Sequence, residues 1–281
     1  MKVVIIGGVA GGATAAARIR RLDEKAEIVV FERSGFISYA NCGLPYYIGG
    51  TIEDEGDLTL QTPESFYKRF RVKMNVRHEV TALHPESKMV TVKNIENGTV
   101  FTETYDKLIL SPGAKPIKPN FEGIDSDKIF TLRTVEDTLK IKKFINEKYP
   151  KSAVVVGGGF IGIEVAENLR ELGIDVTLVE AADQLMAPFD SDMASFIHAE
   201  LRKNGINLML GRFVEGFADT DDGICVKLKN SPTLHANMVV MAIGVAPETT
   251  LAKDAGLELG IKGSIVVNDR METSVTDIYA V

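Results

Sequence analysis

The feature that most constrains this fold is a glycine-rich turn that occurs twice. The turns are Gly7–Gly12 and Gly157–Gly162, and each separates a short apolar run from a helical segment. Strand, helix and strand are expected at residues 2–6, 11–22 and 27–31, and again at 153–156, 161–172 and 175–179. Each repeat ends on an acid, Glu32 or Glu180. This order is typical of a dinucleotide-binding βαβ unit with a parallel sheet.

The second turn, Gly157-Gly158-Gly159-Phe160-Ile161-Gly162, has the complete G-x-G-x-x-G pattern. Its glycines allow a tight turn, close approach of the backbone to a pyrophosphate, and close helix–strand packing. Glu180 follows Gly162 by 18 residues, where a carboxylate accepts hydrogen bonds from a ribose diol. No Lys or Arg occurs in the next twenty residues to neutralise a 2′-phosphate. We therefore expect NADH rather than NADPH at this site.

The first turn, Gly7-Gly8-Val9-Ala10-Gly11-Gly12, departs from the pattern because Val9 occupies the position of the second glycine. Glu32 follows Gly12 by 20 residues and marks the expected ribose position. By itself this glycine pattern would suit an ordinary strand–helix turn equally well. Its recurrence with a second strand and an acid favours a second nucleotide site.

The segments between these units indicate smaller elements. Helices are expected at residues 63–70, with Thr62 as N-cap, and at 135–149. Residues 72–110 and 206–243 alternate and turn often, which predicts a small antiparallel excursion in each half. The proline-containing stretch 111–119 predicts a loop that crosses between domains. Residues 264–281 resemble strand sequence.

Composition excludes several classes of protein. The 281 residues carry a net charge of −7 without a basic block, so nucleic acid is not an expected partner. The apolar runs are too short to span a bilayer. Two cysteines, Cys42 and Cys225, are too few for a disulfide framework, so we expect a cytoplasmic protein. The four histidines are scattered without metal-ligand spacing, and no metal site is predicted.

The run Ser38-Tyr39-Ala40-Asn41-Cys42-Gly43-Leu44-Pro45-Tyr46-Tyr47-Ile48-Gly49-Gly50 resembles the active-site segment of coenzyme A-disulfide reductases. With the two glycine turns it resembles the flavin- and NADH-dependent pyridine nucleotide–disulfide oxidoreductases over the whole chain. This group includes persulfide and polysulfide reductases and single-cysteine NADH oxidases. The resemblance implies an α/β fold with two Rossmann-like domains, the NADH domain inserted into the FAD domain. The implied boundaries are 1–117 for the first part of the FAD domain, 118–246 for the NADH domain and 247–281 for the second, incomplete part of the FAD domain.

The resemblance also implies which residues contact the two cofactors. Those for FAD are Gly7, Gly8, Ala10, Gly11, Glu32, Arg33, Asn41, Val80, Ser111 and Gly113. Those for NADH are Gly157, Gly159, Phe160, Ile161, Gly162, Glu164, Glu180 and Gly244. Phe160 resembles an aromatic gate over the nicotinamide, although core packing would also explain it. Glu164 resembles a carboxylate beside the nicotinamide, although an ordinary helix-surface acid would fit its spacing.

Cys42 is the expected catalytic residue. Members with a dithiol have a second cysteine five residues away, but Tyr47 and Ile37 occupy those positions here. The partner sulfur must therefore come from outside, or Cys42 must cycle through a sulfenic acid. A free thiol is only a few per cent ionised at neutral pH. Full ionisation requires roughly 3 kcal/mol, whereas a helix N-terminus supplies about 0.3–1 kcal/mol. The resemblance implies that an adjacent flavin supplies the remainder. The alternative for Cys42 is a small buried apolar residue, the interpretation that we prefer for Cys225.

Arg18 and Arg21 are three residues apart and share one helix face. Spacing alone suits a solvated surface, whereas the resemblance implies a coenzyme A site made of Thr14, Arg18, Arg21, Ser38 and Asn41. One departure is Phe70, which aligns with a lysine of the family, and Arg69 or Arg71 could reach the same phosphate. Coenzyme A disulfide or another small thiol compound is therefore the expected partner.

The ending Thr276–Val281 resembles the second FAD motif of the family, whose next residues are normally Gly-Asp. We therefore expect this chain to be part of a longer, homodimeric protein. The expected function is electron transfer from NADH through FAD to a disulfide, persulfide or polysulfide at Cys42. The alternatives are a single-cysteine NADH oxidase or peroxidase and, for this fragment, a redox-inactive nucleotide-binding module.

Overall fold

Two five-stranded parallel sheets organise the chain, one in each of two units. The computed structural model describes all 281 residues. The first unit comprises residues 1–40, 59–115 and 246–281, and the second comprises 41–58 and 116–245. Residues 41–58, which include Cys42, are thus grouped with the second unit, whereas the sequence predicted them within the first domain. Which nucleotide each unit binds stays a prediction at this point.

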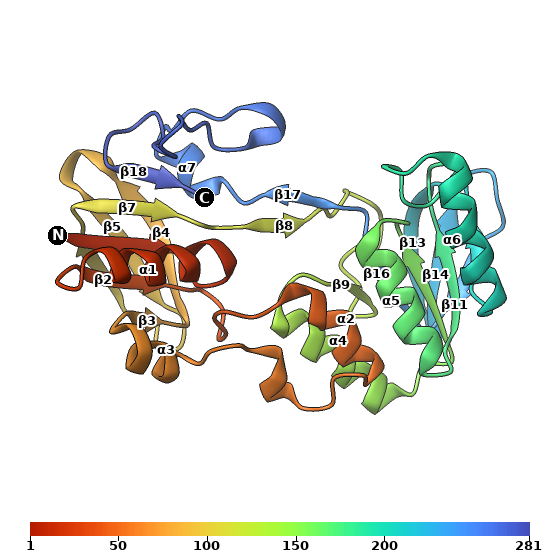
Figure 1. The fold of residues 1–281 in the computed structure, drawn as a ribbon. Coiled ribbons are helices and arrows are strands. Elements are labelled where there is room, and N and C mark those ends of the chain that lie inside the picture. Colours follow the sequence, from red (N-terminus) through yellow and green to blue (C-terminus); the bar gives the residue numbers. More distant parts are fainter. The chain divides into compact units, whose positions relative to one another are not determined.

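The sheet of the first unit has the strand order β18-β7-β1-β2-β3, and every neighbouring pair is parallel. Its strands are β1 (Lys2–Ile6), β2 (Glu27–Phe31), β3 (Lys73–Asn75), β7 (Lys107–Leu110) and β18 (Ile278–Ala280). Both faces of this sheet are covered (Figure 1). One face packs on helices α1 (Ala10–Leu22) and α3 (Pro63–Phe70) through side chains such as Val3 and Ile5.

The other face of this sheet, which includes Val4 and Ile6, packs on an antiparallel sheet and a short helix. These are strands β4 (His78–His84), β5 (Met89–Asn94) and β6 (Val100–Thr104) and helix α7 (Thr250–Asp254). Burial on both faces explains why the β1 sequence is continuously apolar rather than alternating. Short 3-10 turns lie at Pro85–Ser87 and Ile261–Gly263.

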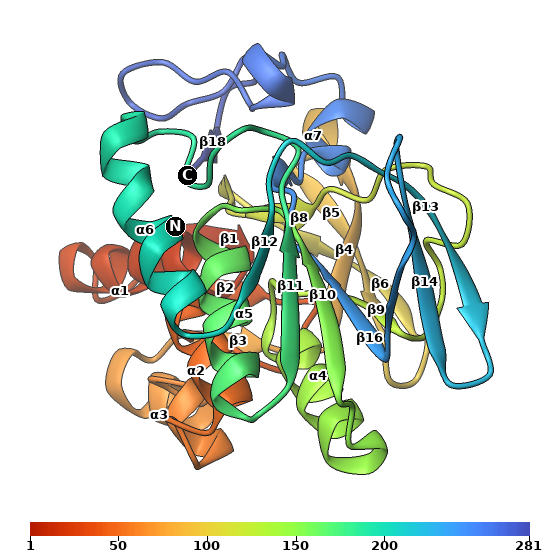
Figure 2. The same ribbon diagram turned by 90° about the vertical axis from the view of Figure 1, so that its right-hand side faces the viewer.

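The sheet of the second unit has the order β12-β11-β10-β16-β9 and is also parallel throughout. Its strands are β9 (Ile129–Thr131), β10 (Ser152–Val156), β11 (Asp175–Val179), β12 (Asn207–Met209) and β16 (Met238–Met241). Figure 2 shows helix α5 (Phe160–Glu171) beside one face and strands of a second sheet beside the other. That second sheet is antiparallel, with β13 (Val214–Thr220), β14 (Gly223–Leu228) and β15 (Leu234–Ala236). This architecture confirms the predicted α/β class with a small antiparallel sheet in each half.

Three more helices complete the second unit: α2 (Leu44–Gly49), α4 (Val135–Lys148) and α6 (Ser191–Lys203). Helix α2 follows a 3-10 turn at Asn41–Gly43, precedes another at Glu55–Leu58, and packs on α4 and α5. The Lys142 ammonium of α4 donates to the carbonyl oxygen of Ile48 at 2.8 Å, which closes the C-terminal end of α2. Strands β8 (Ala114–Pro116) and β17 (Val245–Pro247) form a two-stranded sheet, so the expected loop 111–119 contains a strand.

No element was predicted for residues 191–203, which form helix α6. One expectation was wrong in detail. Of the strand-like residues 264–281, only β18 is a strand. Local bonds compete with extended structure there: the Asn268 side chain accepts from the N–H groups of Arg270 and Glu272.

None of the helices combines the length and the apolar character needed to cross a bilayer.

Candidate functional site

The glycine turn of the second unit requires glycine at two positions. Gly157 has φ +111°, and a Cβ there would stand 2.4 Å from the carbonyl oxygen of Ala242. A Cβ on Gly162 would stand 1.9 Å from the carbonyl oxygen of Gly157. Around Gly159, in contrast, no heavy atom lies within 4 Å of the position that a Cβ would occupy, so the space beside it is open. Packing therefore explains Gly157 and Gly162, whereas the open space beside Gly159 leaves room for the predicted ligand.

The first unit repeats this turn. Gly7 has φ +101°, and a Cβ on Gly12 would stand 1.9 Å from the carbonyl oxygen of Gly7. A Cβ on Gly11 would come within 2.6 Å of the Ser111 hydroxyl oxygen, so Ser111 lies against the turn as the predicted site requires. Val9 occupies the position of Gly159 and has φ −99°, a value that any residue adopts.

Both terminal acids bind the turn that precedes them. Glu32 accepts hydrogen bonds from the backbone N–H of Gly8 and of Ser34, each at 2.8 Å. Glu180 accepts from Gly158 at 2.6 Å and from Ala182 at 2.7 Å. An ionised carboxylate has about four acceptor positions, so each acid retains acceptors for a ribose diol. The two acids thus hold the glycine turn and remain available to a nucleotide.

The helices after the two turns begin without a side-chain cap. Neither Val9 at the start of α1 nor Gly159 at the start of α5 provides one. Helices α3 and α4, in contrast, begin with capping boxes at Thr62, as predicted, and at Thr134. Uncapped N–H groups beside an open glycine turn suit a pyrophosphate. The residues present in both units therefore fit a bound dinucleotide.

A pocket of about 400 Å³ opens at the glycine turn of the second unit. It brings together four of the predicted NADH residues: Gly157, Gly159, Glu180 and Gly244. The other four, Phe160, Ile161, Gly162 and Glu164, belong to α5 and do not line it. Gly244 has φ +116°, which only glycine adopts without strain.

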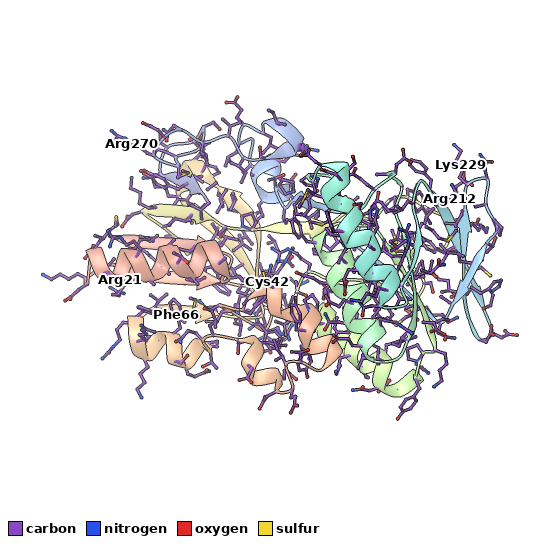
Figure 3. The ribbon with its side chains drawn as sticks, turned by 45° about the vertical axis from the view of Figure 1, so that its right-hand side comes forward. Arg21, Cys42, Phe66, Arg212, Lys229 and Arg270 are labelled. Carbon is purple, nitrogen blue, oxygen red and sulfur yellow. The ribbon has the colours of Figure 1, made fainter.

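Arg212 and Phe213 also line this pocket, and the sequence did not predict them. Arg212 is 32 residues after Glu180, beyond the twenty residues that contain no Lys or Arg. Strand β12 pairs with β11, and the backbone N–H of Arg212 donates to the Glu180 carbonyl oxygen at 3.0 Å. Strand pairing therefore brings a cation to the same pocket as Glu180, the acid predicted to bind ribose (Figure 3 labels Arg212).

Phe160 and Glu164 lie in the first two turns of α5, and their exposure differs. Phe160 is 61% exposed, so core packing, the alternative explanation of this residue, is wrong. Burial, and then the charge of Glu167, raise the pKa of Glu164. Glu164 in turn is the first cause of a raised pKa for Tyr46 on α2, followed by burial. Glu164 is therefore half-buried against α2 rather than an ordinary surface acid.

Cys42 is exposed and lies in the 3-10 turn immediately before α2 (Figure 3). Its exposure contradicts the alternative of a buried apolar residue. Pro45 lies in the first turn of α2, as predicted, and no side chain caps that helix. Cys225 lies in β14, where its sulfur is 3.5 Å from His235 Nδ1, and both cysteines are free thiols. Cys42 thus has a solvent-accessible sulfur and no cysteine partner within the chain.

The remaining predicted FAD residues have varied environments. Gly113 has φ +70°, and its carbonyl oxygen accepts from the N–H of Glu248 at 3.0 Å. Arg33 lies 4.0 Å from the Glu248 carboxylate, and Val80 is buried in β4. Gly8, Ala10 and Ser111 belong to the turn region described above, whereas Asn41 belongs to the second unit. Contact of these residues with FAD stays a prediction.

Helix α1 exposes Thr14, Arg18 and Arg21 along one face. Arg20 has a different role, because its guanidinium donates to the carbonyl oxygens of Phe70 at 2.8 Å and Glu24 at 2.7 Å. The Phe70 ring packs on Phe66 with centroids 4.7 Å apart, so Phe70 serves the core. Ser38 has φ +49°, and its N–H donates to the Gly8 carbonyl oxygen at 3.0 Å. Ser38 belongs to the first unit and Asn41 to the second, so the complete substrate set stays a prediction.

Comparisons with known proteins agree with this geometry. The chain matches the family described as pyridine nucleotide-disulphide oxidoreductase over residues 1–281. It is 40% identical over 280 residues to the coenzyme A disulfide reductase of Staphylococcus aureus (strain JH9), covering 100% of this chain and 62% of that protein. The chain thus spans less than two thirds of the curated relatives that it matches.

Solved structures agree as well. The crystal structure of reduced Bacillus anthracis CoADR-RHD is 48% identical, with a TM-score of 0.97 over 100% of this chain and 50% of that chain. The NAD-dependent persulfide reductase from A. fulgidus is 36% identical, with a TM-score of 0.94, and the match covers 100% of this chain and 52% of that chain. The water-forming NADH oxidase from Lactobacillus brevis, bound to NADH, is 34% identical, with a TM-score of 0.93, and the match covers 100% of this chain and 61% of that chain. The chain therefore belongs to the pyridine nucleotide-disulphide oxidoreductase family, which confirms the predicted fold class and the predicted cofactors, FAD and NADH.

Proposed function

We propose that the protein carrying this chain reduces a small-molecule disulfide or persulfide with electrons from NADH, using Cys42 as its redox-active thiol. NADH is assigned to the second unit and FAD to the first. Coenzyme A disulfide is the first substrate to test, because relatives with 40% and 48% identity carry that activity or its abbreviation in their names.

The observation that carries this proposal is the exposed, unpartnered sulfur of Cys42 before the uncapped helix α2. A thiol that acts by attack on an outside disulfide needs access to solvent and no internal partner. Cys42 meets both requirements, and Tyr47 occupies the position of a second cysteine.

In the proposed reaction, the Cys42 thiolate attacks one sulfur of the substrate disulfide. A mixed disulfide forms and the first thiol leaves. Two electrons and protons then cleave the mixed disulfide, release the second thiol and restore Cys42. One NADH supplies the two electrons and is oxidised to NAD⁺, with one additional proton from solvent. FAD, when bound, supplies the redox relay between nicotinamide and sulfur.

The side chains of this chain bind and orient the reactants. The open turn at Gly159 and the N–H groups at the start of α5 suit the pyrophosphate of NADH, and Glu180 suits its ribose. The exposed Thr14, Arg18 and Arg21 of α1 suit the phosphates of coenzyme A.

A second candidate is an NADH oxidase or peroxidase in which Cys42 cycles through a sulfenic acid. The similarity to the Lactobacillus brevis water-forming NADH oxidase favours it specifically. In that case oxygen or peroxide, rather than a disulfide, accepts the electrons.

The deciding experiment compares NADH oxidation by the whole protein with coenzyme A disulfide, polysulfide and oxygen. We expect the highest kcat/KM with one of the sulfur substrates and its loss in Cys42→Ser. Faster turnover with oxygen than with every sulfur compound would replace the proposal with the second candidate. A purified protein without flavin absorbance would instead favour a redox-inactive nucleotide-binding module.

A further inference from the structure

Gly158, in the glycine turn of the second unit, packs against the segment Leu185–Met186, which has no part in the proposed reaction. Leu185 is fully buried, and a Cβ on Gly158 would stand 2.3 Å from its Cδ2 atom. The backbone N–H of Met186 donates to the Gly158 carbonyl oxygen at 2.9 Å. Met186 has φ +52°, a conformation that a non-glycine residue adopts only when its surroundings hold it. The pair Leu185–Met186 therefore packs directly behind the turn that is proposed to receive the NADH pyrophosphate.

One histidine holds this segment in position. The backbone N–H of Leu185 donates to Nε2 of His198, on helix α6, at 3.0 Å. Nε2 can accept this bond only when the ring is neutral and its proton is on Nδ1. Protonation would add a second N–H at Nε2, which would point at the N–H of Leu185, and the bond would be lost.

The surroundings of the ring favour the neutral form. Burial, and then the charge of Arg202 one turn later on α6, lower the pKa of His198. The segment that contains Leu185 also carries Asp183 and Asp190, and the Glu180 carboxylate accepts from the N–H of Gly158 at 2.6 Å. Glu164 on α5 also has a raised pKa, so a change in NADH binding between about pH 5 and 7 is assigned to His198 only if it disappears in His198→Gln.

We propose that His198 is a positioning residue of the NADH site: its neutral ring holds Leu185 against the glycine turn, and its protonation releases that contact and weakens NADH binding. This inference rests on the proposed assignment of NADH to the second unit. It gives His198, which has no metal-ligand or catalytic spacing in the sequence, a specific role without direct contact with the nucleotide.

The sign of the pH dependence follows from the direction of the shift. Because the pKa is lowered in the folded protein, the contribution of the bond is complete above the ordinary histidine value of about 6.5. It is lost as the pH falls further, through the lowered pKa of His198 in the folded protein. Loss of the bond leaves the buried N–H of Leu185 without an acceptor, so we expect the Kd for NADH to rise about tenfold in acid.

The test measures direct binding of NADH by calorimetry at several values between about pH 5 and pH 8, with the protein reduced beforehand so that NADH binds without transferring electrons. Three forms of the whole protein are compared: wild type, His198→Gln and His198→Ala. The glutamine carbonyl can accept the Leu185 N–H but does not titrate, so His198→Gln should bind NADH tightly at every pH. His198→Ala should bind about tenfold more weakly at neutral pH and show little further loss in acid.

His235→Gln is the matched control, because His235 is an exposed histidine of the same unit, on β15. It should retain the pH dependence of the wild type. Circular dichroism at each pH verifies that every variant remains folded.

Two results would overturn the inference about His198 alone: NADH affinity that does not change down to about pH 5, or His198→Gln with the same pH dependence as wild type. Absence of NADH binding at every pH in the wild type would overturn the assignment of the NADH site as well. The two failures are therefore distinguishable.

Discussion

The carboxylate of Glu180 accepts a hydrogen bond from the backbone N–H of Gly158 at 2.6 Å, across 22 residues of sequence. The same relationship recurs between Glu32 and Gly8 at 2.8 Å. In both units the acid at the end of the second strand therefore fixes the conformation of the glycine turn before it. These acids therefore have an observed role in the structure of the turn, in addition to the predicted role in the recognition of ribose.

Charge removal at Glu180 should change the preference between NADH and NADPH. In Glu180→Gln, the repulsion of a 2′-phosphate disappears while Arg212 remains in the same pocket. We expect the ratio of kcat/KM for NADPH to that for NADH to rise about tenfold. The ratio is the informative quantity, because any disturbance of the glycine turn affects both nucleotides.

Arg212→Ala in the Glu180→Gln background is the control for that experiment. If Arg212 binds the 2′-phosphate, this second substitution should return the ratio toward the wild-type value. A ratio that stays high without Arg212 would show that the arginine has no part in the selection.

Cys42→Ser should abolish disulfide reduction without affecting stability. The serine hydroxyl is not a nucleophile at neutral pH without a base, so we expect a loss of about 1,000-fold or more in kcat. Because Cys42 is exposed, the free energy of unfolding should change by less than about 0.5 kcal/mol. Steady-state kinetics and urea unfolding measure the two quantities. Cys225→Ser is the matched control and should retain turnover; equal losses in both variants would contradict a special role for Cys42.

Substitution of two glycines of one turn by alanine should change different properties, stability at Gly162 and NADH affinity at Gly159. In Gly162→Ala the new Cβ meets the Gly157 carbonyl oxygen at 1.9 Å, so the protein should lose about 2–4 kcal/mol of unfolding free energy. In Gly159→Ala the new Cβ meets no atom within 4 Å, so stability should be nearly unchanged. NADH affinity should nevertheless fall in Gly159→Ala, because the methyl group would occupy the space in which the pyrophosphate is proposed to bind. Unchanged affinity in that folded variant would argue against a nucleotide at this turn.

The three arginines of α1 should divide into two classes. Arg20→Ala removes the donors to the carbonyl oxygens of Phe70 and Glu24, and should destabilise the protein by about 1–3 kcal/mol. Arg18→Ala and Arg21→Ala should leave stability unchanged and raise the KM for coenzyme A disulfide about tenfold each. The KM for cystine, a disulfide without phosphates, should stay the same in these two variants. An equal rise for both substrates would exclude a role in phosphate binding.

Local features of the fold were predictable from the sequence because they depend on neighbouring residues. The glycine turns require a positive φ at Gly7 and Gly157, and the capping box at Thr62 needs only Ser65. The central strands β1, β10 and β16 are buried on both faces, so their sequences are almost continuously apolar. Helix α6 was not predicted, although its sequence has a helical period as clear as that of the predicted helices α1, α4 and α5.

The sequence by itself determined the two strand–turn–helix–strand repeats, the absence of a second cysteine near Cys42 and the family. Only the tertiary structure brought Arg212 into the pocket of Glu180 and set His198 behind the glycine turn. Arg212 reaches its position because β12 pairs with β11, and His198 because α6 folds back on the segment around Leu185. Such contacts join residues far apart along the chain, and spacing in the sequence carries no information about them.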